Sequence, residues 1–273
     1  MILLDPLARP VIGHRGNRAF APENTLESLL EAVALGADAL EFDLRLSRDG
    51  QLVVFHDPTL ERTTDGEGPV AQRTLAELKR LDAGARFSRD GGRSFPWRGR
   101  GVTVSSFDEV IDALPRELPC IIELKTPLAA EPLRRAVQRH GIARRIIVAG
   151  FDPQSTRPLR GAGFALGAST PDVVALLPAA LLHLRTRPRH VQALCIPQRW
   201  HGLPVPIAAL AHALHGSGTV VHVWTVNDPE QARRLWASGV QGIISDDPAL
   251  LLKTRGRPAS ANAEVPIRQD RRP

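Results

Sequence analysis

The chain has 273 residues, of which 43% are hydrophobic and 23% are charged, and its formal net charge is +6. This is enough chain for one large α/β domain with a sizeable core, in the composition range of ordinary soluble proteins. The positive charge comes from scattered arginines rather than from one basic helix, and tyrosine is absent, so we expect no nucleic-acid partner.

The first elements predict a strand, a helix and a second strand. Residues 11–14 form a short apolar run that ends at a polar turn. Asn24 is placed to cap a helix, and Glu27, three residues later, completes a capping box. Apolar residues from Leu26 onward follow helical spacing, and Gly36 is a plausible stop. A second strand is then expected from Ala39.

Residues 39–57 have the pattern of a β-hairpin. Two apolar runs, 39–46 and 51–55, flank the dipeptide Asp49-Gly50, which is a strong turn signal. The turn is far too short to connect parallel neighbours, which need a long crossover. We therefore expect residues 51–55 to run back antiparallel to the second strand.

Acidic side chains occupy one face of this second strand. Glu41 and Asp43 are two residues apart, so both point to the same side. Two neighbouring carboxylates resist burial unless a cation, a shared proton or solvent accompanies them. The hairpin ends at His56, which it would return to the neighbourhood of the two acids.

The rest of the chain alternates between helices and strands after an irregular segment, 58–101, that contains one short helix at 75–81. Expected helices are 107–114, 132–140, 155–162, 171–182, 207–215, 229–237 and one starting at 248. Expected strands are 120–125, 145–151, 165–168, 193–196, 220–226 and 242–245. Alternation of this kind implies parallel pairing through right-handed crossovers.

Without the returning hairpin strand, eight strands remain, each followed by a helix. This predicts an α/β fold of the (β/α)8 TIM-barrel class, with an insertion at about 47–104 between the second strand and its helix. The competing architecture is an open doubly wound sheet. We expect a single domain over 1–253 and a disordered tail over 254–273, where proline, arginine and alanine show no periodicity.

The cellular setting is expected to be cytoplasmic. The N-terminus lacks the features of a signal peptide, and the longest apolar stretch, near 173–184, contains Pro178 and is too short to cross a bilayer. Cys120 and Cys195 lie in apolar runs, as buried free thiols do in a reducing compartment. We expect no stable membrane insertion.

In a barrel of this class, the active site forms at the carboxyl ends of the strands. Those ends and the hairpin offer three acids, two cations, two histidines and a tryptophan: Glu41, Asp43, Glu123, Arg15, Lys125, His14, His56 and Trp224. Converging carboxylates suit Mg²⁺ or Ca²⁺, the cations suit a phosphate, and histidines exchange protons near neutral pH. The set predicts metal-dependent phosphate-ester chemistry. Lys125 could instead simply pair with Glu123, and Trp224 could be a core residue.

Several short motifs occur in order between residues 11 and 248. They include His14-Arg15-Gly16, Glu41-x-Asp43, His56-Asp57, Ile122-Glu123-Leu124-Lys125 and Trp224-Thr225-Val226-Asn227. Together they closely resemble the glycerophosphodiester phosphodiesterase family. Departures from the family pattern, such as Gln241 and Ser245, touch none of the candidate site residues.

The resemblance implies one divalent cation, Mg²⁺ or Ca²⁺, on Glu41, Asp43 and Glu123. It also implies that His14 and His56 are general base and general acid, in an order the motifs leave open. Arg15 and Lys125 would bind the phosphate. The implied reaction is hydrolysis of a small glycerophosphodiester to sn-glycerol 3-phosphate and an alcohol.

Two alternative functions remain open at this stage. A lysophospholipase D-like enzyme acting on lipid phosphodiesters would need an apolar groove, and residues 86–100 of the insertion offer only Phe87, Phe95 and Trp97. A non-catalytic barrel that binds phosphosugars would not need both histidines. The oligomeric state and the preferred alcohol are open as well.

Overall fold

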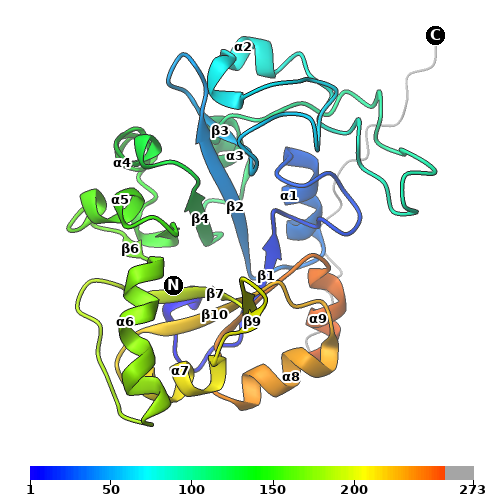
Figure 1. The fold of residues 1–273 in the computed structure, drawn as a ribbon. Coiled ribbons are helices and arrows are strands. Elements are labelled where there is room, and N and C mark those ends of the chain that lie inside the picture. Colours follow the sequence, from blue (N-terminus) through cyan, green and yellow to red (C-terminus); the bar gives the residue numbers. More distant parts are fainter. Residues whose placement is uncertain (256–273) are drawn as a thin grey trace.

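A computed structural model describes residues 1–255 of the chain. Eight parallel strands form a nearly closed barrel, in the order β6-β5-β4-β2-β1-β11-β10-β7 (Figure 1). They are β1 (Val11–His14), β2 (Ala39–Leu46), β4 (Cys120–Leu124), β5 (Ile146–Ala149), β6 (Ala165–Leu166), β7 (Ala193–Pro197), β10 (Val220–Trp224) and β11 (Gly242–Ser245). A parallel bridge between Gly167 and Ala193 links the two ends of the row. The predicted TIM barrel is confirmed, and the open sheet is excluded.

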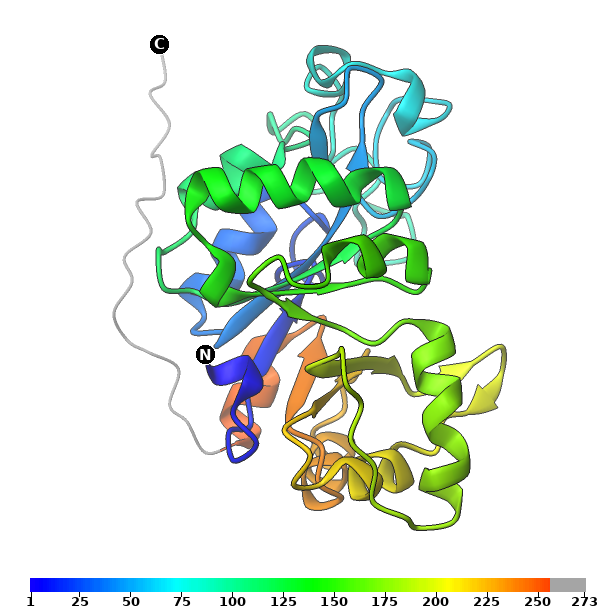
Figure 2. The same ribbon diagram turned by 90° about the vertical axis from the view of Figure 1, so that its left-hand side faces the viewer.

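Helices lie around the outside of the barrel strands, except α2, which lies in the insertion (Figure 1 and Figure 2). They are α1 (Leu26–Ala34), α2 (Leu75–Leu78), α3 (Phe107–Ala113), α4 (Ala130–His140), α5 (Pro153–Thr156), α6 (Thr170–Leu181), α7 (Ile207–Leu214), α8 (Pro229–Ala237) and α9 (Pro248–Thr254). Within the described residues, no helix combines the length and apolar character that crossing a bilayer requires.

Alternation along β2 separates the outer core from the functional interior. Leu40, Phe42 and Leu44 are buried in the cluster between the strands and the helices, where Phe107 of α3 lies 6.4 Å from Phe42 between ring centroids. A second apolar cluster fills the lower barrel interior and includes Leu3 of the N-terminal turn. Glu41 and Asp43, which alternate with these apolar residues along β2, lie in the upper interior of the barrel.

The insertion begins as a hairpin, as predicted. β3 (Leu52–Val54) pairs antiparallel with the end of β2, with Leu44 opposite Val54 (Figure 1). The insertion has a small core of its own, built on residues such as Val53, Phe55 and Val104. This core fixes the chain that follows β3 and therefore the position of His56.

Several local predictions differ from the structure. The helix expected over 155–162 is α5 followed by a short 3-10 turn at Arg157–Leu159, since Pro158 has no N–H for a continuing α-helix. An unpredicted hairpin, β8 (Arg199–Trp200) and β9 (Leu203–Pro204), follows β7.

The predicted disordered tail overlaps the described residues only at its start. There, Thr254 is the last residue of α9 and Arg255 pairs with Asp38, so these two residues are ordered against expectation. The remainder of the predicted tail, 256–273, lies outside the described residues.

Candidate active site

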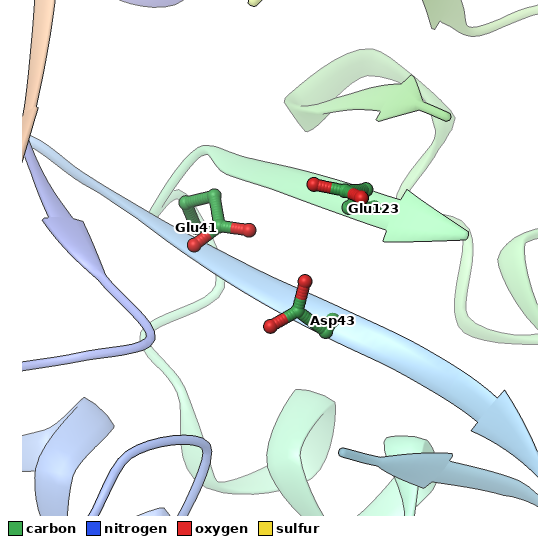
Figure 3. A group of neighbouring side chains, drawn as sticks. All are labelled: Glu41, Asp43 and Glu123. Atoms are coloured by element: carbon green, nitrogen blue, oxygen red, sulfur yellow. The ribbon is translucent and has the colours of Figure 1, made fainter. Parts of the chain in front are cut away.

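Three carboxylates meet inside the mouth of the barrel. Glu41 and Asp43 come from β2 and Glu123 from β4, where the parallel register sets Asp43 beside Glu123 (Figure 3). One oxygen from each side chain lies within 4.8 Å of the others. Glu41 and Asp43 are buried and Glu123 is nearly so, so that water does little to screen their mutual repulsion.

This repulsion is visible in the pKa values of the acids. Burial, reinforced by the charge of Asp43, raises the pKa of Glu41 well above its usual value. The same two causes raise the pKa of Glu123. Burial also opposes ionisation of Asp43, but Lys125 and Arg15 outweigh it and hold the pKa of Asp43 below its usual value. The cluster is thus short of positive charge.

A divalent cation fits this cluster. Asp43 Oδ1 is a buried carboxylate oxygen that accepts no hydrogen bond within the described part of the chain. Lys125 Nζ lies 3.0 Å away, but only as an ion-pair contact. Oxygen-only ligands, one of them incompletely satisfied, are the donor set that Mg²⁺ and Ca²⁺ favour.

The two predicted cations already contact the acids. Arg15 Nε lies 3.1 Å from Asp43 Oδ2, while Arg15 Nη1 donates to Glu23 Oε1 at 2.7 Å. Lys125 Nζ donates to Glu123 Oε1, so this lysine does pair with Glu123. Both cations also line the cavity that contains Glu41 and Glu123.

Each predicted histidine is held by a carboxylate. Nδ1 of His14 bonds to Asp246 Oδ1 at 2.6 Å, and Nδ1 of His56 bonds to Asp57 Oδ1 at 2.5 Å. An ionised carboxylate only accepts, so each Nδ1 carries a proton and each neutral ring offers the lone pair of Nε2. Burial lowers the pKa of both histidines, which favours these neutral forms.

The structure brings all eight predicted site residues together. Seven line one cavity, and Asp43 lies among them beside Arg15 and Lys125: His14, Arg15, Glu41, His56, Glu123, Lys125 and Trp224. Trp224 forms a wall with Phe151, whose ring lies 5.9 Å away edge-on. Phe151 in turn stacks on Trp200 of the β8–β9 hairpin at 5.2 Å. The cavity is therefore lined both by acids and by the aromatic rings of Phe151 and Trp224.

The predicted helix cap proves to be part of the site. Thr25, not Asn24, caps α1, because its side chain accepts from Ser28 N. Asn24 adopts φ +59°, a region that asparagine tolerates, and donates to Asp43 Oδ2 at 2.8 Å. Asn24 thus orients the central acid.

Sequence reasoning also missed the carboxylates that surround the two histidines. Asp57 directly follows His56, and Asp246 directly follows the eighth barrel strand, so their positions were the available signals. Sequence reasoning assigned no role to Glu23. It accepts from Arg15, Arg18 and Arg62, which outweigh its burial and hold its pKa far below the usual value.

Comparison with known proteins gives consistent matches. The profile of the glycerophosphoryl diester phosphodiesterase family matches residues 14–250. A glycerophosphodiester phosphodiesterase of Caldanaerobacter subterraneus subsp. tengcongensis is 33% identical over 257 residues, which cover 89% of this chain and 96% of that protein.

Solved structures match over nearly their whole length. An Oleispira antarctica phosphodiesterase, solved with the product sn-glycerol-3-phosphate, has a TM-score of 0.71 and 27% identity, covering 91% of this chain and 97% of that one. The same fold occurs in a glycerophosphoryl diester phosphodiesterase domain from Mycobacterium tuberculosis, with a TM-score of 0.78 and 24% identity, covering 91% and 99%.

Proposed function

This chain belongs to the glycerophosphoryl diester phosphodiesterase family, and we propose that it hydrolyses glycerophosphodiesters to sn-glycerol 3-phosphate and an alcohol. The observation that carries the proposal is one cavity that joins three acids, two cations and two carboxylate-held histidines. A diester needs charge neutralised on phosphorus oxygens and protons moved at two others, and this cavity offers groups for both tasks.

We propose that Glu41, Asp43 and Glu123 hold one divalent cation, Mg²⁺ or Ca²⁺. When bound, the cation would neutralise charge on the phosphate oxygens. Arg15 and Lys125 line the same cavity and would bind the remaining phosphate oxygens through charge-assisted hydrogen bonds. Asn24 keeps Asp43 in place by two hydrogen bonds, to its side chain and to its backbone N–H.

Proton transfer is assigned to His14 and His56. One ring, neutral with its free Nε2, takes the proton of the glycerol 2-hydroxyl as that oxygen bonds to phosphorus. The other ring, protonated, gives its proton to the alcohol oxygen as the phosphorus–oxygen bond breaks. A cyclic phosphate results, and water opens it with the two roles exchanged. Asp246 and Asp57 would stabilise the imidazolium form of their histidines.

A lipid phosphodiester is a second candidate substrate, favoured by one observation. Trp200 and Leu203 of the β8–β9 hairpin are 39% and 72% exposed, and Trp200 reaches the cavity wall through Phe151. Rates on glycerophosphocholine and lysophosphatidylcholine separate the two candidates, because a lipid-directed enzyme prefers the second.

The deciding experiment measures glycerol 3-phosphate released from a panel of glycerophosphodiesters, after chelation and after adding back Mg²⁺ or Ca²⁺. We expect His14→Ala and His56→Ala each to lower kcat by about 10²- to 10⁴-fold. His190→Ala, an exposed histidine of a distant loop, is the matched control and should keep its rate. Full turnover by either active-site variant would exclude the mechanism, and full activity after chelation would exclude the metal site.

A further inference from the structure

A groove lined by arginines lies beside the catalytic cavity. Its cationic residues, Arg18, Arg62, Arg86 and Arg89, come from the β1–α1 loop and from two parts of the insertion, and its volume is about 390 Å³. We call these four residues the arginine groove. In Figure 1 the irregular part of the insertion passes close to α1, and Trp97 Nε1 of that segment donates to Phe20 O at 3.0 Å. The groove is thus formed where the insertion packs on the barrel.

Among the residues that line the arginine groove, arginines outnumber carboxylates by four to two. Only two carboxylates line it, Glu23 and Asp246, and both already pair with Arg18. Arg86 donates to the carbonyl of Thr64, and Arg89 lies over the ring of Phe20 at 4.0 Å. Neither of these two arginines forms an ion pair within residues 1–255. Their guanidinium groups remain available to an anion.

The loop that carries Arg89 is held in shape by its own acid. Asp90 accepts hydrogen bonds from the hydroxyls of Ser88 and Ser94 and from the N–H groups of Arg93 and Ser94. These bonds hold the pKa of Asp90 at about 2. Because the Asp90 carboxylate accepts hydrogen bonds from its own turn, it forms no ion pair with Arg89. These bonds order the loop before a ligand binds, which lowers the entropic cost of binding.

The arginine groove and the catalytic cavity share a wall one side chain thick. Asp246 Oδ1 accepts from His14 Nδ1 at 2.6 Å and lies 3.4 Å from Arg18 Nη1. Glu23 likewise joins Arg15 of the cavity to Arg62 of the groove. A group attached to the reacting phosphate through a short alcohol therefore has cationic side chains next to it.

We propose that the arginine groove binds a second anionic group, a phosphate or carboxylate carried by the alcohol half of the substrate. This inference rests on the proposed function and names its substrate class. Guanidinium groups suit it because their planar donors bind phosphate and carboxylate oxygens in pairs. A substrate with an anionic alcohol gains these contacts, whereas one with a neutral or cationic alcohol does not.

The test uses a matched pair of substrates, glycerophosphoglycerol and the same diester with a phosphate on the terminal hydroxyl of its alcohol. We expect the wild-type protein to favour the phosphorylated diester by about tenfold in kcat/KM, mostly through KM, as one charge-assisted contact provides. The double variant Arg86→Gln/Arg89→Gln should lose this preference and keep its rate on the neutral diester. Arg100→Gln, an exposed arginine of the same insertion outside the groove, is the control for charge.

The possible results distinguish a failure of the arginine-groove proposal from a failure of the proposed function. No turnover of any diester overturns the proposed function, whereas equal turnover of the pair by the wild-type protein overturns the groove alone. Inhibition by inorganic phosphate tests whether the arginine groove binds a free anion instead of a group on the substrate. If phosphate inhibits only the anionic diester, and only when Arg86 and Arg89 are present, the inference is supported. If it binds there without any substrate preference, the groove is a site for free anions and the inference is wrong.

Discussion

Two glutamates at the mouth of the barrel, Glu41 and Glu23, stand in opposite charge environments. Burial and the charge of Asp43 raise the pKa of Glu41 well above its usual value. Glu23 is also largely buried, yet its three arginine partners hold its pKa far below that value. The two acids lie on either side of Arg15, whose backbone N–H donates to Glu41 and whose side chain donates to Glu23.

The different pKa shifts of Glu23 and Glu41 distinguish an acid that stabilises the fold from an acid that is available to bind a ligand. Glu23 is balanced by side chains that are always present, so its ion pairs hold the β1–α1 loop and the insertion together. Within the described residues, Glu41 has no comparable set of cationic partners, and the divalent cation that we propose would stabilise its charge. A buried acid that the fold leaves unmatched indicates a binding site, whereas a matched one indicates a structural contact.

The largest effect is expected from neutralising the unmatched acid. Glu41→Gln should lower kcat/KM at least about 10³-fold, because loss of one ligand weakens a cation worth several kcal/mol to the transition state. Titration of the metal should show weaker binding by Glu41→Gln and unchanged binding by Glu23→Gln. If both variants lost the metal equally, the contrast between the two acids would be wrong.

The matched acid should instead control stability. Glu23→Gln leaves the charges of Arg15, Arg18 and Arg62 without their shared partner, and we expect it to lower the free energy of unfolding by about 3 kcal/mol. Urea denaturation measures this. Glu117→Gln, an exposed glutamate, is the control and should change stability by less than about 0.5 kcal/mol. An equal loss in both variants would contradict a structural role for Glu23.

Sequence reasoning reached the acids of β2 and β4 because strand geometry is regular. Two residues of spacing put Glu41 and Asp43 on one face, and parallel pairing brought Glu123 beside them. The short turn at Asp49-Gly50 forced an antiparallel return and so gave the position of His56. Regular periodicity and a short turn were enough to predict the barrel and to place these residues near one another.

The contacts of the irregular loops could not be reached in this way. Asn24 matched a helix cap by spacing, but its left-handed backbone turns it toward Asp43 and leaves the cap to Thr25. Glu23 meets Arg62 across 39 residues, a contact that depends on how the insertion packs. No periodic pattern specifies such contacts, and the arginine groove depends on them in full.

Asp246 lies between the two environments and is expected to have an intermediate effect. Asp246→Asn keeps the shape of the side chain but removes the charge that holds His14 Nδ1, and we expect kcat to fall about tenfold. Asp57→Asn should have a smaller effect, since His56 is also fixed by Arg45, which donates to its carbonyl at 2.8 Å. Steady-state kinetics measure the kcat of each variant relative to the wild-type protein, and unchanged melting temperatures exclude unfolding. A larger effect of Asp57→Asn would reverse this ranking.

The stability of the protein should depend on pH and on the metal together. A folded-state pKa above the unfolded one means that Glu41 stabilises the metal-free protein only at low pH. This contribution is lost as pH rises from the ordinary glutamate pKa to the raised one, at about 1.4 kcal/mol for each pH unit between them. A bound cation holds Glu41 ionised and removes the penalty, so the rise in melting temperature on adding Mg²⁺ or Ca²⁺ should be larger at pH 8 than at pH 5.

Glu23 predicts the opposite dependence in the same protein. Its lowered pKa means that its stabilisation is complete at neutral pH and is lost as pH falls below the ordinary glutamate value, whether or not metal is present. Melting curves from pH 4 to pH 8, with chelator and with metal, separate the two acids. Glu41→Gln should remove the metal-linked dependence and leave the acid-side loss in place. A metal-induced rise that is the same at pH 5 and pH 8 would show that Glu41 is ionised without the cation, and the acid cluster would then need no metal to balance it.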